Sequence, residues 1–163
     1  MIRPFILEDI HYVIASHMDI YGTEYGFDLS FRDYIEETTR HFVQTFDPAK
    51  ENLWIAEVNE QSVGTIAIVN IDSTTAQLRW FLLEPQFRGI GLGRQLLETA
   101  ITFARECGYR TLRLWTSNLL ETARYLYLRY GFAIVEQTEQ ILSGITLIEE
   151  IWELNLESLD NTV

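Results

Sequence analysis

The sequence lacks several features that mark common classes of protein. It has a single cysteine, Cys107, so no intrachain disulfide can form and a Cys-rich zinc site is excluded. Basic residues are scarce, 12 against 24 acidic ones, and the net charge of −12 disfavours binding to nucleic acid or to an anionic membrane. No stretch approaches the roughly 18 apolar residues that span a bilayer, and the first residues lack the apolar run of a signal peptide. We therefore expect a cytoplasmic domain with no metal, nucleic-acid or membrane partner.

What is present is the composition of one folded domain. The chain has 163 residues, of which 47% are hydrophobic, which is enough to bury a single core. We expect one domain over residues 1–156, followed by a flexible C-terminal tail at residues 157–163. The four tryptophans lie in predicted strands and are expected in the core: Trp54, Trp80, Trp115 and Trp152.

The apolar pattern of the chain predicts a mixed α/β (α+β) fold. Helical spacing of apolar residues predicts helices at residues 9–21, 30–46, 91–107 and 118–130. Asp9 and Asn118 are in position to cap the first and last of these, and Gly22 and Gly26 break the pattern after the first. Alternating or β-branched runs predict strands at residues 52–58, 62–71, 76–83, 110–116, 132–136 and 145–156, after a short extended start. Because the links within residues 52–83 are too short for crossovers, we expect a mostly antiparallel sheet of about seven strands flanked by about four helices.

A glycine-rich turn between a strand and a long helix is the most informative segment. Gly89, Gly91 and Gly93 alternate there, which lets the backbone bend tightly and leaves its N–H groups unobstructed. Those N–H groups lie at a helix N-terminus, where unpaired donors and the helix dipole favour an anion. Arg88 and Arg94 add positive charge. The segment therefore predicts a cradle for a pyrophosphate group.

Other interpretations of this turn compete with that prediction. A nucleotide P-loop ends in Gly-Lys-Ser/Thr, whereas this turn ends in Gly93-Arg94-Gln95. A dinucleotide-binding fingerprint has the spacing G-x-G-x-x-G within a parallel βαβ unit, whereas here the spacing is G-x-G-x-G after an antiparallel meander. A structural glycine turn, which only packs the helix against the strand, remains the alternative.

A second motif downstream relates the turn to a known family. The pattern Arg88-x-x-Gly91-x-Gly93 is followed later by Leu126-Tyr127-x-x-x-Gly131-Phe132. Together, and with these strands around them, the two motifs resemble those of the GNAT superfamily of acyl-CoA-dependent N-acetyltransferases. The resemblance covers nearly the whole chain. In more detail, the chain resembles the acetyltransferase half of MarR–GNAT fusion proteins, in which a MarR-type DNA-binding domain precedes that half.

The resemblance implies a co-substrate and roles for named residues. In the family, the strand that ends here at Leu82 and Leu83 splays from its neighbour to admit acetyl-CoA. Tyr127 would be the general acid that reprotonates the departing thiolate, after an amine has attacked the thioester directly through a tetrahedral intermediate. A strand N–H, at Leu83, would stabilise the oxyanion. The implied coenzyme A contacts are Leu82, Leu83, Arg88, Gly89, Ile90, Gly91, Leu92, Gly93 and Arg94, with Asn118 or Ser117 as a further contact.

The sequence defines the acceptor side less well. The acceptor would be a small-molecule or peptide amine, and the segment that overhangs its pocket in the family carries Tyr21, Glu24 and Tyr25. The general base is open among Glu24, Glu57, Glu136 and a chain of water molecules. The three histidines are interpreted as structural or solvated: His11, His17 and His41. A non-catalytic module that binds or senses acyl-CoA is the alternative function, and a homodimer formed through the C-terminal strands is compatible with the family.

The acidic excess is unevenly distributed along the chain. From Arg79 to Arg129 there are eight Arg and four Glu, a local net charge of +4. The rest of the chain carries four basic and twenty acidic residues, a net charge of −16. This split is consistent with an anionic co-substrate that meets a neutral or cationic amine, although solvated surface acid is the plainer interpretation.

Overall fold

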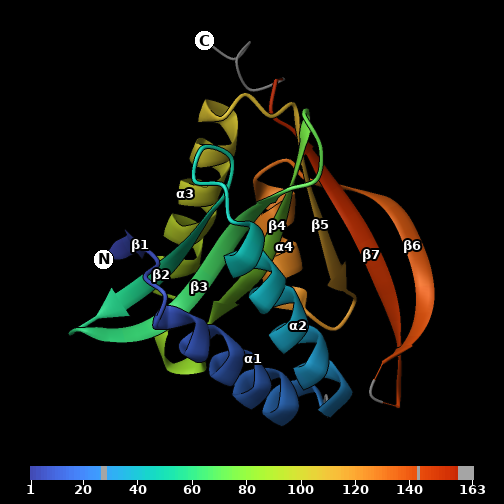
Figure 1. Ribbon diagram of the computed structural model, residues 1–163. Coiled ribbons are helices and arrows are strands. Elements are labelled where there is room, and N and C mark those ends of the chain that lie inside the picture. Colours follow the sequence, from blue (N-terminus) through green and yellow to red (C-terminus); the bar gives the residue numbers. More distant parts are fainter. Residues whose placement is uncertain (27–28, 143, 158–163) are drawn as a thin grey trace.

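A seven-stranded sheet organises the fold, with α1 and α2 on one face and α3 and α4 on the other (Figure 1). The computed structural model describes residues 1–26, 29–142 and 144–157, so the predicted tail lies outside the described residues except for Glu157. The strands are β1 (Ile2–Pro4), β2 (Asn52–Val58), β3 (Gln61–Asn70), β4 (Thr75–Leu83), β5 (Thr111–Ser117), β6 (Ala133–Leu142) and β7 (Ile145–Asn155). The helices are α1 (Asp9–Tyr25), α2 (Leu29–Thr45), α3 (Leu92–Glu106) and α4 (Glu121–Arg129), with a short 3₁₀ turn at Pro85–Phe87.

The strand pairing leaves a gap in the middle of the sheet. In the order β1-β2-β3-β4-β5-β7-β6, all neighbours pair antiparallel except β4 and β5, which run parallel. The β4–β5 pairing extends only from Thr75 and Thr111 to Gln77 and Arg113, beyond which the two strands separate. The arrangement confirms the predicted mixed, mostly antiparallel fold, and it confirms that the strand ending at Leu83 splays from its neighbour.

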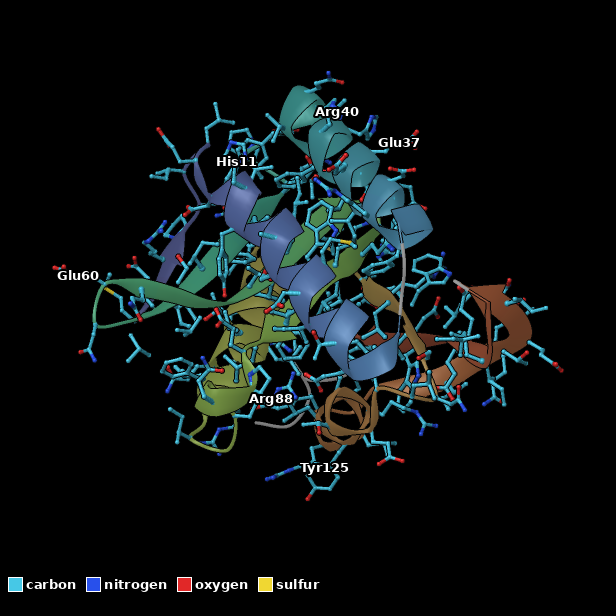
Figure 2. All side chains as sticks on the ribbon, turned by 90° about the horizontal axis from the view of Figure 1, so that it is seen from below. His11, Glu37, Arg40, Glu60, Arg88 and Tyr125 are labelled. Atoms are coloured by element: carbon cyan, nitrogen blue, oxygen red, sulfur yellow. The ribbon has the colours of Figure 1, made fainter. Side chains whose placement is uncertain are left out.

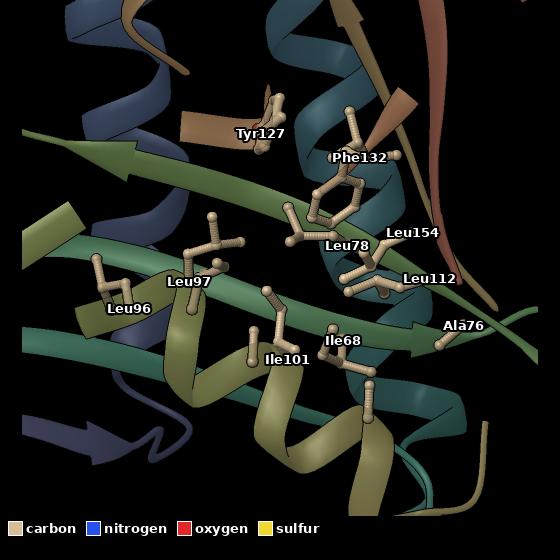
Figure 3. Packing of buried hydrophobic residues seen from close by; sticks show 14 of the residues in the cluster. Ile68, Ala76, Leu78, Leu96, Leu97, Ile101, Leu112, Tyr127, Phe132 and Leu154 are labelled. Carbon is tan, nitrogen blue, oxygen red and sulfur yellow. The ribbon is translucent and has the colours of Figure 1, made fainter. Parts of the chain in front are cut away.

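Apolar side chains of α3 and α4 cover one face of the sheet. Apolar residues recur in α3 at a spacing of three or four, so Leu96, Leu97 and Ile101 share one side of the helix. They belong to the same buried cluster as Ile68 and Leu78 of the sheet (Figure 3). Burial of each such side chain is worth about 1.5–3 kcal/mol. This core holds the start of α3 against the end of β4.

A second core lies on the opposite face, under α1 and α2. Val13 of α1 and Phe42 of α2 are buried there with Ile55 and Trp80 of the sheet. The Phe42 and Trp80 rings meet edge to face, with centroids 5.4 Å apart. The two helices are thereby fixed over the middle of β4.

A β-bulge in β4 changes which side chains face this second core. The register with β3 shifts between Thr65 and Ala67, and Trp80 has a φ of +49°. Leu78 packs in the core beneath α3, whereas Trp80 packs in the core beneath α1 and α2. Because side chains alternate along a strand, Arg79 faces away from Leu78. The bulge therefore places Arg79 and Trp80 on the same face, toward α1 and α2.

The first helix differs from its predicted bounds. It continues through Gly22 to Tyr25 and ends at Gly26, whose φ of +73° is the left-handed conformation of a helix C-cap. A glycine inside a helix costs only about 1 kcal/mol, which the burial of one apolar side chain offsets. The predicted cap is also wrong, because Glu8 is the N-cap and the Asp9 carboxylate instead pairs with the Arg3 guanidinium at 2.8 Å.

Asn118 does not cap α4 as predicted. Leu120 is the N-cap, and no side chain hydrogen-bonds to the backbone there. Asn118 instead pairs with β7: its Oδ1 accepts the Ile148 N–H at 2.9 Å, and its own N–H donates to the Ile148 carbonyl at 3.0 Å. The long partner strand β7 also explains why β6 extends to Leu142, six residues beyond the predicted end at Glu136.

Three of the four tryptophans are core residues, as predicted, and one is not. Trp54, Trp80 and Trp152 are buried, whereas Trp115 is 39% exposed. Trp115 lies in β5 beyond the last pair with β4, where the two strands have separated. Its ring therefore lines a cavity instead of a core.

Candidate active site

A cavity of about 760 Å³ lies where β4 and β5 separate. Its walls come from α1, α2, β4, the loop before α3, β5 and α4. The predicted site residues that line it are Tyr21, Leu82, Leu83, Arg88, Gly89, Ile90, Gly91, Gly93, Arg94 and Tyr127. Leu92 is buried in the core beneath α3, and Glu24 and Asn118 are not among the lining residues. The side chain of Tyr25 lies outside the described part of the chain.

The loop before α3 presents a row of backbone donors. Within the described residues, the N–H groups of residues 89–94 have no acceptor, and the first helical hydrogen bond runs from Gln95 to the Gly91 carbonyl at 3.1 Å. The row begins at Gly89 because the Arg88 N–H donates to the Pro85 carbonyl at 3.3 Å. Gly89 and Gly91 have φ values of +83° and +90°, which favour glycine. Such donors at a helix N-terminus fit the diphosphate of coenzyme A.

The backbone of Leu83 faces the gap that β5 leaves. The Glu84 N–H donates to the Val63 carbonyl at 2.9 Å, and Leu83 lies opposite Gly64 of β3. Hydrogen-bonded and non-hydrogen-bonded pairs alternate along an antiparallel ladder, so the polar groups of Leu82 point toward β3 and those of Leu83 point away from it. An extended ligand lying in the gap therefore meets the Leu83 N–H, whereas the Leu83 carbonyl accepts a hydrogen bond from Arg88.

Arg88 links three parts of the site. Its Nε donates to the Leu83 carbonyl at 2.9 Å, and its Nη2 lies 2.9 Å from Oε1 of Glu24 at the end of α1. In Figure 2 the Arg88 side chain lies beside the C-terminal end of α1. One predicted coenzyme contact and one predicted acceptor-side residue are thus joined in an ion pair. Both side chains are about one-third exposed, at 33% and 29%.

Tyr127 is held in an aromatic enclosure. It is 4% exposed, and its ring lies 5.5 Å from Phe132, 5.9 Å from Trp152 and 6.1 Å from Phe81, measured between centroids. Burial, with a smaller effect from Tyr21, raises the pKa of the Tyr127 hydroxyl above its ordinary value. The phenol therefore keeps its proton at neutral pH, as a proton donor must.

A partly buried ion pair fixes the helix that carries Tyr127. Arg124 of α4 donates from Nε and Nη2 to the two carboxylate oxygens of Glu150 in β7, at 2.8 and 2.9 Å. Glu150 is 1% exposed and also accepts the Trp152 indole N–H at 3.0 Å. This two-pronged geometry orients α4 on the sheet.

The sequence interpretation missed His17 as a cavity residue. Its Nδ1 lies 2.7 Å from the Val13 carbonyl, which only accepts, so Nδ1 carries the proton and Nε2 is the acceptor. Nε2 is buried and has no partner within the described residues, and the side chain lines the cavity. Burial lowers the pKa of His17 to about 4. The helical spacing with Val13 and Tyr21 indicated a buried face, but not that this face borders a cavity.

The charged residues that line the cavity are all arginines. They are Arg79, Arg88, Arg94 and Arg129, and no Asp or Glu among the described residues lines it. The acidic excess therefore does not lie on the acceptor side of the cavity. None of the three predicted base candidates is placed there: Glu24 pairs with Arg88, Glu57 lies 3.1 Å from Arg3, and Glu136 is exposed on β6.

Comparison with known proteins assigns the family. The chain belongs to the Acetyltransferase (GNAT) family, whose model matches residues 14–132. The match confirms the resemblance drawn from the glycine-rich turn and the tyrosine motif.

Relatives with similar sequences include a named N-acetyltransferase and an N-acetylaspartate synthetase. Human N-acetyltransferase 8B is 30% identical over 110 residues, which are 64% of this chain and 47% of that protein. The N-acetylaspartate synthetase of Danio rerio is 30% identical over 122 residues, 72% of this chain and 43% of that protein. The chain thus spans about half the length of the curated relatives it matches.

Solved structures share the fold. A GNAT-family acetyltransferase from Staphylococcus aureus Mu50 superposes with a TM-score of 0.78 at 18% identity, covering 96% of this chain and 98% of that one. The yncA protein of Salmonella typhimurium, solved with its cofactor acetyl-CoA, has a TM-score of 0.70 at 18% identity, covering 96% and 93%. None of the described helices has the length and apolarity to cross a membrane.

Proposed function

We propose that this chain transfers an acetyl group from acetyl-CoA to the nitrogen of an amine. One observation carries the proposal: the row of backbone donors at residues 89–94 and the Tyr127 phenol belong to the same cavity. The backbone donors suit the binding of a diphosphate, and the Tyr127 phenol is a buried proton donor at the other side of the gap. Membership of the GNAT family supports the same activity.

Each residue has a role in this transfer. Acetyl-CoA supplies the thioester, at whose carbonyl carbon a C–N bond forms and the C–S bond breaks. The Leu83 N–H, at the free strand edge, stabilises the charge that develops on the carbonyl oxygen. The Tyr127 hydroxyl gives its proton to the departing thiolate sulfur. The loop residues from Gly89 to Arg94 hold the diphosphate.

His17 is not the base in this transfer. Its Nε2 is unprotonated, but it is buried and has no surface open to an amine in the cavity. A group with a pKa of about 4 is also a weak base at neutral pH. The excess proton of the amine therefore passes to water.

The proposal is tested by two measurements on the same protein. Calorimetry with coenzyme A and acetyl-CoA measures binding, and release of free thiol from acetyl-CoA in the presence of an amine panel measures transfer. We expect both. A chain that binds neither thioester nor coenzyme contradicts the proposal at its base.

A non-catalytic acyl-CoA-binding module is the second candidate function. It is favoured by one observation, that no carboxylate base lines the cavity within the described residues. Tight acetyl-CoA binding without transfer to any amine in the panel would support this candidate over the first.

A further inference from the structure

Arg79 of β4 lines the cavity, and no Asp or Glu of the described residues lies within ion-pair distance of it. Arg94 and Arg129, which also line the cavity, have no ion pair among the described residues either. Arg79 differs from these two in its position, on the face of the sheet toward α1 and α2. Burial lowers the pKa of the Arg79 guanidinium, and smaller opposing effects of Tyr34 and Glu51 do not offset it.

Two contacts hold this guanidinium in place. Its Nε donates to Oε1 of Gln77 at 2.8 Å, and its carbon lies 5.9 Å from the centre of the Trp80 ring. The terminal nitrogens of Arg79 are left without a partner in the described part of the chain. Two terminal N–H groups on a fixed plane match the two oxygens of a carboxylate. The site is therefore preorganised for such a group.

The position of Arg79 separates it from the coenzyme end of the cavity. It precedes Leu83 by four residues on β4, and because of the bulge this matches three residues of β3, roughly 10 Å of strand. It faces α1 and α2, on the side of the sheet that also carries Trp80 and Trp115, whereas Arg94 lies at the start of α3 and Arg129 on α4. The diphosphate is thus served by other groups, and Arg79 is left for the acceptor.

The residues around Arg79 indicate the chemical character of the rest of the acceptor. Phe31 and Ile35 of α2 are buried and line the same cavity, as do Tyr34 and the half-exposed Trp115. These walls suit an apolar or aromatic body. We propose that the acceptor is an amino acid-like amine with an apolar body, whose carboxylate is bound by Arg79. This inference rests on the proposed acetyl transfer for the identity of the amine as acceptor.

Matched ligands test the carboxylate. Phenylalanine is compared with phenylalanine amide and with phenylethylamine, whose amine basicities bracket that of the amino acid. Binding is measured by calorimetry on the protein loaded with coenzyme A, so the readout does not depend on turnover. We expect the amino acid to bind roughly 10- to 100-fold more tightly than either counterpart without a carboxylate, the range for a charge-assisted pair of hydrogen bonds. Equal affinities for the three ligands, or no binding of any, would overturn the inference.

Variants of Arg79 assign the effect to this residue. Arg79→Gln should lose the preference for the amino acid and leave the affinity for the amide unchanged, whereas Arg79→Lys should restore part of the preference. Arg40→Gln, the same change of charge on the exposed side of α2 (Figure 2), should have no effect. A loss in Arg79→Gln that is equal for acid and amide would show a merely structural role and overturn the inference.

A parallel assay of thiol release separates this inference from the proposed function. Transfer to amines without preference for a carboxylate would sustain the acetyl transfer and overturn the role of Arg79. Carboxylate-selective binding without transfer to any bound amine would sustain the role of Arg79 and overturn the acetyl transfer.

Discussion

The two ends of the cavity are built in different ways. At the coenzyme end, the ligand would meet backbone groups from one continuous segment, β4 through the start of α3. At the acceptor end, it would meet side chains from α1, α2, β4 and β5, which are far apart in the sequence. The first end depends on where the chain turns, and the second depends on how separate elements pack.

This difference has consequences for tolerance to substitution. A backbone-built end is sensitive to changes of conformation and largely indifferent to which side chains are present, except where glycine is required. A side-chain-built end loses one defined interaction with each substitution. Variants at the two ends should therefore fail in different assays, and the expected effects below test whether they do.

Tyr127→Phe should have the largest effect. The phenyl ring keeps the packing against Phe81, Phe132 and Trp152, while the proton donor is lost. We expect the rate of thiol release at saturating acetyl-CoA to fall by roughly 10²-fold or more, with coenzyme A affinity unchanged.

Tyr130→Phe is the matched control for Tyr127→Phe. The Tyr130 hydroxyl donates to Glu98 and does not line the cavity, so its removal should leave the rate unchanged. A wild-type rate for Tyr127→Phe would remove the general-acid assignment and leave the coenzyme end intact.

His17→Gln should remove the part of the pH dependence of stability that comes from the buried His17 imidazole at the acceptor end. The folded-state pKa of His17 is about 4, below the ordinary value of about 6.5, so the unfolded chain binds the extra proton first as pH falls. The stability that the neutral His17 side chain contributes is therefore fully present above pH about 6.5 and is lost as pH falls toward 4. Between pH 7.5 and 4.5, wild type should lose about 2–3 kcal/mol more of its unfolding free energy than His17→Gln does.

Urea unfolding at the two pH values measures this difference. His11→Gln is the matched control, because His11 is exposed on the same helix, and it should keep the wild-type pH dependence. An unchanged pH dependence in His17→Gln would show that the imidazole is not the group that resists protonation.

The sequence predicted the coenzyme end in more detail than the acceptor end, for the same structural reason. Gly89, Gly91 and Gly93 alternate between a strand and an amphipathic helix, which is a pattern visible in a short stretch of sequence. The same glycines line the cavity, so recognising the pattern also locates the site. The helices and strands of the core could be predicted equally well. In α3, for example, the apolar residues are spaced to match the side of the helix that is buried.

The acceptor end could not be predicted from the sequence, because its residues come together only when the separate elements pack. Arg79 shares its face with Trp80 on account of a bulge at Trp80, and no residue type near it marks a bulge. His17 and Trp115 fit an ordinary helix face and an ordinary strand until the splay of β4 from β5 leaves a space beside them. The wrong prediction of a cap at Asn118 has a similar origin. The Asn118 side chain instead accepts a hydrogen bond from Ile148 of β7, thirty residues away in the sequence.

Gly91→Val should weaken the coenzyme end with a smaller effect than the loss of the proton donor. A β-branched residue at φ +90° is strained, and relieving the strain moves the neighbouring N–H groups. We expect roughly a 10-fold loss of coenzyme A affinity by calorimetry, as for one hydrogen bond to a charged group.

Gly108→Val separates strain from binding. Gly108 has a similar φ of +87°, with open space around it, but it lies at the far end of α3 and outside the cavity. Both variants should lose about 1–2 kcal/mol of stability, and only Gly91→Val should lose affinity. Equal affinities in the two variants would mean that the donor row does not hold the coenzyme.

Glu24→Gln should have the smallest effect, because it breaks only the link between the two ends. The ion pair with Arg88 is partly exposed and such pairs are worth about 0.2–1 kcal/mol, while Arg88 keeps its hydrogen bond to the Leu83 carbonyl. We expect the KM for acetyl-CoA to change by less than roughly 5-fold with kcat retained, and Glu37→Gln, exposed on α2, to change neither. A fall in kcat as large as that expected for Tyr127→Phe would instead identify Glu24 as the general base, and the two ends of the cavity would then share a catalytic residue.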